Sequence, residues 1–332
     1  IRDVERSRGL GDVYKRQGKY GIYVANYGGP TRYYELNTGQ VLDLAEKLKL
    51  NKITGGRAVV AGNILSGKTD IFAANERGKN FLYYNSDGFF QDIAEDYKVD
   101  DQYENGRGTV LSDILYRGRL DVVTSNWNGY HRAFVLEDTK FKDIATPTYN
   151  IPTRIRTVIS ADFDNDGYDE IFMNNIGEPN KLFKIKENGF FEEIAIQNAY
   201  ESNGLGTGAA VADIDDDGIL ELLVSHGESG MQPLTMYKAD IKTDFNYIRI
   251  KPTNKFGAPA RGATVILSSN LRKHAKTIDA GSGYLCQMEP VAHYGLREGE
   301  KNISIDVIWT NGLLSLIHIS EPTRPLYSSY AV

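Results

Sequence analysis

The chain is poor in the features of disulfide-stabilised, membrane-spanning and nucleic-acid-binding proteins. Its 332 residues include one cysteine, Cys286, so neither an internal disulfide framework nor a cysteine-based zinc site can form. No apolar run approaches the ~20 residues that a membrane-spanning helix needs. Lys and Arg number 38 against 44 Asp and Glu, and the formal charge of −6 argues against a general nucleic-acid binder, which presents a basic face.

Glycine and tyrosine are abundant instead, at 33 and 21 residues. Glycine favours turns and tyrosine favours strands, so the composition predicts turn-rich β structure rather than helix. Hydrophobic residues make up 41% of the chain and charged residues 25%, which predicts a folded rather than a disordered protein.

Both ends of the chain look like translated sequencing adaptors. SRGLGDVYKRQ at residues 7–17 and LSLIHISEPTR at residues 314–324 resemble one transposase adaptor in its two orientations. We therefore expect residues 1–17 and 314–332 to be foreign to the fold, as a fusion scar would be. The gene-derived part would then be a fragment, residues 18–313, without its native termini or any signal peptide.

A repeat of about fifty residues organises the first two thirds of the chain. In each copy a short β-rich run ends on one position, which is asparagine in four copies and histidine in the fifth. These residues are Asn26, Asn75, Asn126, Asn175 and His226, at spacings of 49, 51, 49 and 51 residues. Other short runs precede and follow, such as TVISAD, KLFKI and FFEEIAI, so each repeat predicts about four strands joined by tight turns.

Repeated four-stranded sheets predict a β-propeller. One such sheet cannot bury both of its faces, whereas radial stacking of copies does so. A linear β-solenoid or a β-sandwich is the alternative, and the repeat length and uniform strands favour the propeller. We expect about four and a half blades in residues 18–244, with the N-terminal blades missing. After about Phe245 the repeat stops, and runs such as NYIRIKP and ISIDVIWT predict a small β-sandwich over residues 245–313. The predicted fold class is therefore all-β.

Two acidic loops carry the strongest chemical signal. Both follow the pattern D-x-D-x-D-G-x-x-E, between the first two strands of the last two full blades. Carboxylates at positions 1, 3, 5 and 9, with the backbone carbonyl of position 7, can surround one cation, and glycine at position 6 permits the positive φ of the turn. An all-oxygen site suits Ca²⁺ better than Mg²⁺, which dehydrates reluctantly. The predicted ligands are Asp162, Asp164, Asp166, Tyr168 and Glu170 in one loop, and Asp213, Asp215, Asp217, Ile219 and Glu221 in the other.

Two other interpretations of these loops are weaker. An EF-hand needs a glutamate at position 12 and flanking helices, but position 12 is Met173 or Val224 and both flanks look like strands. The aspartates could simply solvate a turn. The four carboxylates predicted as ligands repel one another without a cation, however, which favours calcium.

The equivalent loops of the two preceding blades keep the turn and lose the carboxylates. Aligned on the same glycine, positions 3 and 5 are Leu115 and Arg117 in one loop, and Ile64 and Ser66 in the other. We predict that these loops bind no calcium. Arg117 or Lys68 could instead pair with the acid that remains at position 9, Asp121 or Asp70 respectively.

Several segments resemble known families. The acidic loops are similar to those of integrin-type FG-GAP (VCBS) propeller repeats. LDVVTSNWNGYHR, RTVISADFDNDGYDEIFMNNI and LLVSHGESGMQPL resemble the cartilage acidic protein family, and the resemblance covers nearly all of residues 18–313. KFGAPARGATVIL and GSGYLCQMEPVAHYGL resemble the ASPIC/UnbV domain that follows the propeller in that family. The resemblance implies a secreted, extracellular, calcium-binding propeller, seven-bladed when complete.

These features favour a secreted scaffold for interaction or adhesion, stabilised by two Ca²⁺ ions and binding extracellular proteins or glycans. We expect no enzyme, no nucleic-acid partner and no membrane span. The conspicuous carboxylates are committed to metal, and no histidine lies beside a serine or cysteine in a catalytic pattern. Two alternatives stay open. One is a propeller-type carbohydrate-active enzyme, which needs two carboxyls facing one cleft; the other is an adhesion-receptor ectodomain, similar to an integrin α head.

Four single residues also have two interpretations each. Cys286 is either a buried small hydrophobe or a cysteine whose partner lies outside this chain. His293, in an apolar run, is expected to be structural rather than catalytic. Trp127 is expected to pack between blades rather than to line a binding surface. Asn302 begins the one N-x-S/T sequon, which is an acceptor only in a secreted eukaryotic protein.

Overall fold

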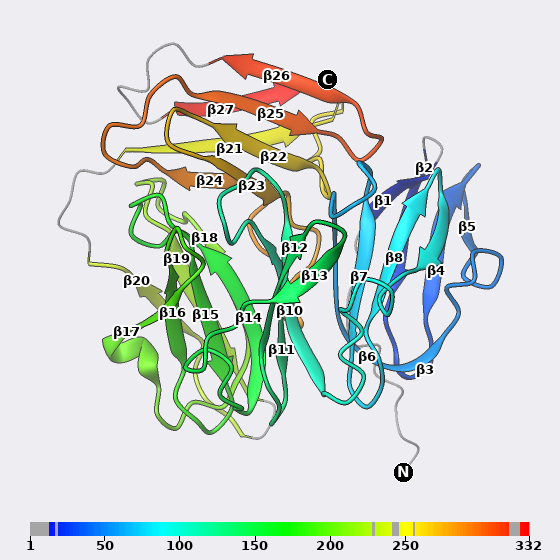
Figure 1. The fold of residues 1–332 in the computed structure, drawn as a ribbon, viewed down its shortest axis with the longest axis horizontal. Coiled ribbons are helices and arrows are strands. Elements are labelled where there is room, and N and C mark those ends of the chain that lie inside the picture. Colours follow the sequence, from blue (N-terminus) through cyan, green and yellow to red (C-terminus); the bar gives the residue numbers. More distant parts are fainter. Residues whose placement is uncertain are drawn as a thin grey trace.

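The computed structural model describes most of the chain. The described residues are 13–16, 19–227, 230–240, 246–254, 256–318 and 326–331. They form 27 strands in seven sheets and one 3₁₀ turn, η1 (Gln197–Tyr200). No described helix has the length and apolar character of a bilayer-spanning segment. The fold is all-β, as the composition predicts (Figure 1).

Five antiparallel sheets follow one another along the chain, one for each copy of the repeat. Their strands pair in chain order, as in the blades of a propeller. Blade 1 contains β1 (Val13–Arg16), β2 (Lys19–Val24), β4 (Arg32–Asn37) and β5 (Gln40–Asp43). Blade 2 contains β6 (Ile53–Gly62), β7 (Asp70–Asn75), β8 (Phe81–Ser86) and β9 (Phe89–Asp92), with β3 (Tyr27–Pro30) paired to β6. Blade 3 contains β10 (Gly106–Ser112), β11 (Asp121–Asn126), β12 (Arg132–Glu137) and β13 (Lys140–Asp143). Blade 4 contains β14 (Ile155–Ala161), β15 (Glu170–Asn175), β16 (Lys181–Ile185) and β17 (Phe191–Ile194). Blade 5 contains β18 (Gly206–Ala212), β19 (Glu221–His226) and β20 (Thr235–Lys238).

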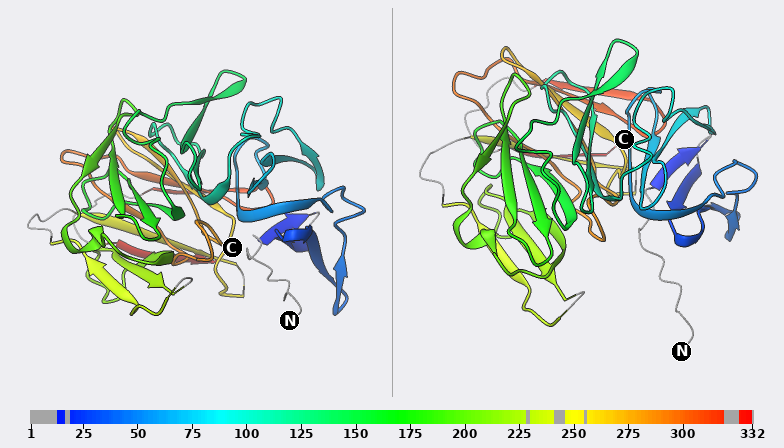
Figure 2. Two further views of the ribbon diagram at one scale, coloured as in Figure 1. Left: turned by 90° about the horizontal axis from the view of Figure 1, so that it is seen from below. Right: turned by 60° about the horizontal axis from the view of Figure 1, so that its bottom comes forward.

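The blades cover one another face to face. The second strands of blades 2, 3 and 4 are buried at every position, so both faces of each strand are covered. Tyr23 of blade 1 packs against Tyr83 of blade 2, with ring centroids 6.0 Å apart. Tyr149, between blades 3 and 4, packs at 4.3 Å against Phe191. Figure 2 shows the blades following one another along an arc, which is the radial stacking of a propeller rather than a linear solenoid.

The repeated asparagine closes the turn that follows each second strand. Asn75 donates its side-chain N–H to the Lys79 carbonyl at 2.8 Å, and its backbone N–H donates to the Asn80 side chain at 3.0 Å. Asn175 repeats both contacts with Pro179 and Asn180. The repeat therefore keeps asparagine because one residue must end a strand and hold the next turn.

A row of arginines joins the first strands of neighbouring blades. Arg57 of β6 and Arg107 of β10 both donate to Glu76, each at 2.6 Å. The guanidinium carbons of Arg107 and Arg156 lie 5.3 and 4.3 Å from the Trp127 ring centroid. Trp127 therefore packs between blades as predicted, held between two cations.

The last part of the described chain forms a two-sheet domain over one end of the blades (Figure 1). One sheet has the order β24 (Ala292–Gly295), β21 (Tyr247–Thr253), β27 (Leu326–Ala331). The other has the order β23 (Lys273–Thr277), β22 (Thr264–Ser268), β25 (Ser304–Ile308), β26 (Leu314–His318). Their facing side chains, including Ile250, Val265 and Ile305, form one hydrophobic core, as expected for a small β-sandwich.

The connection between β23 and β24, residues 278–291, runs along the first strands of blades 3 to 5. Gly283 exchanges two backbone hydrogen bonds with Thr109 of β10, at 3.1 and 2.6 Å. The Thr157 hydroxyl of β14 donates to the Tyr284 carbonyl at 2.9 Å, and the Glu289 N–H donates to the Val211 carbonyl of β18 at 3.2 Å. We call residues 278–291 the axial segment, because it lies where the inner strands of the blades converge.

Glycine is required at one point of the axial segment. Gly283 has a φ of 61°, and a Cβ there would lie 2.8 Å from the Cys286 sulfur and 3.1 Å from the Val158 carbonyl oxygen. Cys286 is half-buried, and its thiol contacts the Ser282 carbonyl at 3.2 Å. Burial raises the pKa of this thiol to about 11, which makes it a packing residue rather than a reactive one.

The two adaptor-like ends lie partly outside the described residues. Where they are described, residues 13–16, 314–318 and 326–331 pair as strands at sheet edges, and β1 completes a fifth blade where we expected half of one. Edge pairing uses the backbone, so it does not test the origin of these segments. Their foreign origin and the bounds of the four predicted segments stay predictions. Asn302, the sequon residue, is exposed.

Candidate metal centre

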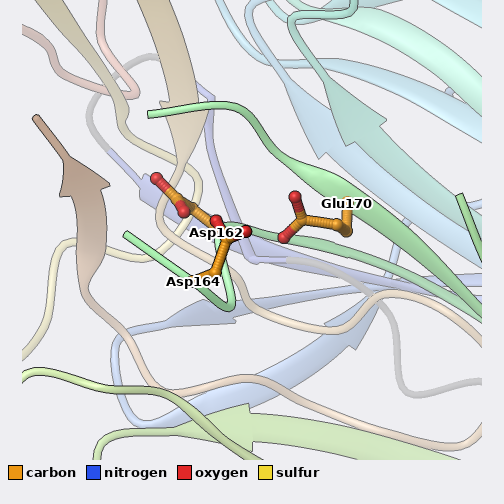
Figure 3. A group of neighbouring side chains, drawn as sticks. All are labelled: Asp162, Asp164 and Glu170. Atoms are coloured by element: carbon orange, nitrogen blue, oxygen red, sulfur yellow. The ribbon is translucent and has the colours of Figure 1, made fainter. Parts of the chain in front are cut away.

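Both acidic loops connect the first and second strands of a blade, β14 to β15 and β18 to β19. Position 9 of each loop begins the second strand, and the strand register places it opposite the residue that precedes position 1. Carboxylate oxygens from positions 1, 3 and 9 thereby gather within 4.8 Å of one another. The residues brought together are Asp162, Asp164 and Glu170 in blade 4 (Figure 3), and Asp213, Asp215 and Glu221 in blade 5.

The turn chemistry is the same in both loops. Gly167 and Gly218, at position 6, have φ of 83° and 85°. Their N–H groups donate to the position 1 carboxylates of Asp162 and Asp213 at 2.9 and 3.0 Å. Position 6 must therefore be free of a side chain, while position 1 is fixed by the backbone of its own loop.

The donor set fits an oxygen-ligated cation. Asp162 and Asp213 are 1% and 6% exposed, and one carboxylate oxygen of each, Oδ1, is buried with no hydrogen-bond partner. Burial, reinforced by neighbouring carboxylates, raises the pKa of Asp162 and Glu170. A cation that takes six to eight oxygens would complete the coordination of the unpaired oxygens and keep these groups ionised. The carbonyls of Tyr168 and Ile219, predicted as further ligands, stay predictions.

The sequence did not reveal a lysine beside each loop, on the third strand of the blade. In blade 4, Lys184 Nζ lies 2.9 Å from Asp164 and 3.3 Å from Glu170, and it also contacts Asp166. In blade 5, Lys238 Nζ lies 2.8 Å from Asp215, 2.8 Å from Asp217 and 2.6 Å from Glu221. These lysines could have been found from the sequence by aligning the second and third strands of each blade, because the strand register pairs each lysine with the position 9 glutamate.

The equivalent loops of blades 2 and 3, which lack the carboxylates at positions 3 and 5, differ from each other. In blade 3, Arg117 lies 3.5 Å from Asp121, as one of our alternatives predicted. In blade 2 the corresponding prediction was wrong, because Lys68 contacts Asp87 instead of Asp70. Asp70 accepts the N–H groups of Leu65 and Ser66 at 2.7 and 2.8 Å, so the backbone already holds this carboxylate.

The second domain touches position 1 of three successive loops. The Gly295 N–H donates to Asp162 at 3.0 Å, and the Ala275 N–H donates to Asp113 at 3.0 Å. Arg249, which is 2% exposed, bridges Asp213 and Glu289, the latter at 2.5 Å. The acidic loops therefore form part of the interface between the blades and the second domain.

Asn165 and His293 extend this interface. The Asn165 side chain donates to the Gly218 carbonyl of the neighbouring loop at 2.8 Å, and its Oδ1 accepts from His293 Nε2 at 2.6 Å. Burial lowers the pKa of His293 to about 3, so the ring is neutral at physiological pH. These contacts support the structural role expected of His293.

A cavity of about 90 Å³ lies between the blades and the second domain. Three acids line it, and each has partners: Lys276 lies 2.6 Å from Asp169, Arg249 holds Glu289, and the Met288 N–H donates to Asp279 at 2.6 Å. The cavity has room for a few water molecules only.

Comparisons with known proteins agree with this architecture. The family model described as FG-GAP-like repeat matches residues 113–173 and 162–224, and the model described as ASPIC and UnbV matches residues 253–324. The chain thus combines an FG-GAP-type propeller with an ASPIC/UnbV domain. It is 44% identical over 335 residues to cartilage acidic protein 1 of Xenopus tropicalis, covering 92% of this chain and 52% of that protein. The human cartilage acidic protein 1 is 43% identical, covering 90% of this chain and 49% of that protein.

The chain belongs to the cartilage acidic protein family, and it spans about half the length of the curated relatives that it matches. Among solved structures, a mutant Aleuria aurantia lectin in complex with α-methyl-L-fucoside matches 96% of this chain and 96% of its own, at 9% identity and a TM-score of 0.43.

Proposed function

We propose that this chain is part of a secreted, extracellular scaffold in which two Ca²⁺ ions stabilise the loops of blades 4 and 5. The observation that supports it best is the pair of buried Asp162 and Asp213 oxygens, which have no partner beside two other converging carboxylates. Bound calcium would offset part of the negative charge of the loops and add its binding free energy to the folded state. The proposed ligands are Asp162, Asp164, Asp166, Tyr168 and Glu170 for one ion, and Asp213, Asp215, Asp217, Ile219 and Glu221 for the other.

An extracellular location fits both the relatives and the chemistry. The matching relatives are named cartilage acidic proteins. Extracellular calcium modules bind with dissociation constants of roughly 10⁻⁴–10⁻³ M, a range that responds to calcium outside cells. The scaffold's partners would be extracellular proteins or glycans, held by contacts rather than by a reaction, so we propose no enzymatic activity. Release of product from a glycan incubated with the protein would overturn that part of the proposal.

Thermal unfolding in calcium and in chelator tests the metal. With a dissociation constant near 10⁻⁴ M, 1 mM calcium stabilises by about 1.4 kcal/mol per site. Two sites together contribute about 2.8 kcal/mol, and a chain of this size has an unfolding entropy of about 0.7 kcal/mol/K, so the melting temperature should rise by roughly 4 °C in calcium. The double variant Asp164→Ala/Asp215→Ala should lose this rise, because each loop then lacks its position 3 carboxylate.

The control is Asp96→Ala, which removes an exposed carboxylate far from both loops in sequence. It should keep the full calcium response. If the wild-type chain melts at the same temperature in calcium and in chelator, the aspartates are turn residues and the proposal is wrong.

A further inference from the structure

We propose that Lys184 and Lys238 are tethered cations that hold the two acidic loops together without calcium and compete with calcium for the same carboxylates. The inference rests on the proposed function, since it names the chain's own groups that set how tightly these loops bind the ion.

The two lysines lie in the blades whose loops have the full set of carboxylates. Each lies on the third strand of its blade, directly opposite the position 9 glutamate: Lys184 opposite Glu170 and Lys238 opposite Glu221. The same register in blades 2 and 3 places Tyr84 and Val135 opposite the position 9 aspartates. Among the described blades, this lysine therefore occurs in blades 4 and 5, whose loops have the full set of carboxylates, and not in blades 2 and 3, whose loops lack them.

Each ammonium occupies the space that a metal ion would need. Lys238 Nζ lies 2.6–2.8 Å from carboxylates at positions 3, 5 and 9, and Lys184 contacts the same three positions. Each ammonium donates to the position 3 carboxylate, Asp164 or Asp215, and lies within ion-pair distance of the carboxylates at positions 5 and 9. Calcium would lie 2.3–2.6 Å from the same oxygens, so the two cations cannot both sit there. One must leave when the other binds.

The lysine completes the loop less fully than calcium would. Neither ammonium contacts position 1 within ion-pair distance, and one buried oxygen each of Asp162 and Asp213 has no hydrogen-bond partner. Oε1 of the position 9 glutamates lies within ion-pair distance of its lysine but also forms no hydrogen bond. The four carboxylates predicted as ligands in each loop carry −4 when ionised, the lysine reduces this to −3, and calcium alone would reduce it to −2. The loop is therefore held, but under residual repulsion that the divalent ion relieves better.

The lysines can move away when calcium enters. Their side chains are 13% and 29% exposed, so each ammonium has a route to solvent along a flexible four-carbon stem. An ordinary lysine ammonium has a pKa of about 10.4, so the competitor is charged at physiological pH.

Replacement by methionine tests the competition, because methionine keeps the length of the stem and removes the charge. We expect opposite effects on two measurements of Lys184→Met/Lys238→Met. Calorimetric titration should show calcium binding about tenfold tighter than in the wild type. Melting in chelator should occur several degrees lower, because the empty loops lose their internal cation. The matched control is Lys181→Met on the same strand as Lys184, paired with Glu193 rather than with the loop.

The outcomes separate the inference from the function on which it rests. Calcium binding by the wild type with unchanged or weaker affinity in the double variant overturns the tethered competitor and leaves the calcium site standing. Absence of calcium binding in every chain overturns both. If the double variant folds only in calcium, the single variant Lys238→Met, at the more exposed lysine, gives the affinity comparison; equal affinity there also overturns the inference.

Discussion

Asn175 illustrates how one side chain fixes the geometry of a repeat. It is fully buried at the end of β15 and donates to the Pro179 carbonyl, while Asn180 accepts its backbone N–H. In blade 5 the position is His226, which contacts the Pro233 carbonyl at 2.7 Å and Glu201 at 2.8 Å. The histidine spans a longer turn than asparagine can, which explains why the fifth copy departs from the repeat.

Replacing Asn175 by alanine should therefore lower the free energy of unfolding by more than the small size of the removed side chain suggests. The change leaves the Pro179 carbonyl without its donor inside the protein, which destabilises by about 1–3 kcal/mol. We expect a corresponding shift of the urea midpoint. Asn203→Ala, at an exposed asparagine, is the control and should unfold as the wild type does. Equal midpoints for both variants would contradict the role of the turn.

At the scale of the elements, a buried ion-pair network links strands of neighbouring blades. Glu76 follows β7, is 8% exposed, and accepts from arginines on the first strands of two blades. Although burial opposes it, the hydrogen bonds and charges of Arg107 and Arg57 lower the pKa of Glu76 to about 2. Its folded pKa lies below the usual 4.5, so its stabilising contribution is complete above about pH 4.5 and is lost as the pH falls toward 2.

The variant Glu76→Gln tests this link between blades 2 and 3. At pH 7 it should be about 3 kcal/mol less stable than the wild type, because two buried arginines lose their counter-charge. The difference should shrink as the pH falls from 4.5 to 3, and denaturant unfolding at several pH values measures it. Glu95→Gln, at an exposed glutamate, should show no such dependence. A difference that is constant with pH would contradict the ionic role of Glu76.

Local patterns predicted most elements, and long-range pairing supplied the rest. The runs TVISAD and IFMNN form β14 and β15, and the acidic loop between them gathers its carboxylates as its spacing indicates. Lys184 stayed hidden because its partnership with Glu170 depends on the register of two strands. The Lys68 prediction failed for a similar reason, since the turn after β8 brings Asp87 closer than Asp70. The axial segment gives no periodic signal, because its partners lie on other elements.

At the scale of the whole molecule, an ion pair connects the second domain to the blade 5 acidic loop. Arg249 of β21 lies between Asp213 of a loop and Glu289 of the axial segment. The interface and the proposed metal site thus use one carboxylate in common. Any cation bound in the blade 5 loop would change the electrostatics of domain docking.

Arg249→Met should reveal this coupling. In chelator the variant should lose about 3–5 kcal/mol, because two largely buried carboxylates face each other without a cation. In millimolar calcium part of the loss should be recovered, since the ion would neutralise Asp213. The calcium-dependent rise in melting temperature should therefore exceed that of the wild type. Arg261→Met, in the same domain but bonded to a carbonyl, should show the wild-type rise. An equal rise in Arg249→Met would show that loop and interface are independent.

The axial segment is synthesised long after the blade strands with which it pairs. Tyr284, which bonds to Thr157 of β14, is made 127 residues later. At about 5–20 residues per second a ribosome needs roughly 6–25 s to cover that distance. During this interval the blades already made have no axial segment to pair with, and their inner edges are open to other chains. The late synthesis of the axial segment therefore prolongs the period in which these edges can pair with other chains.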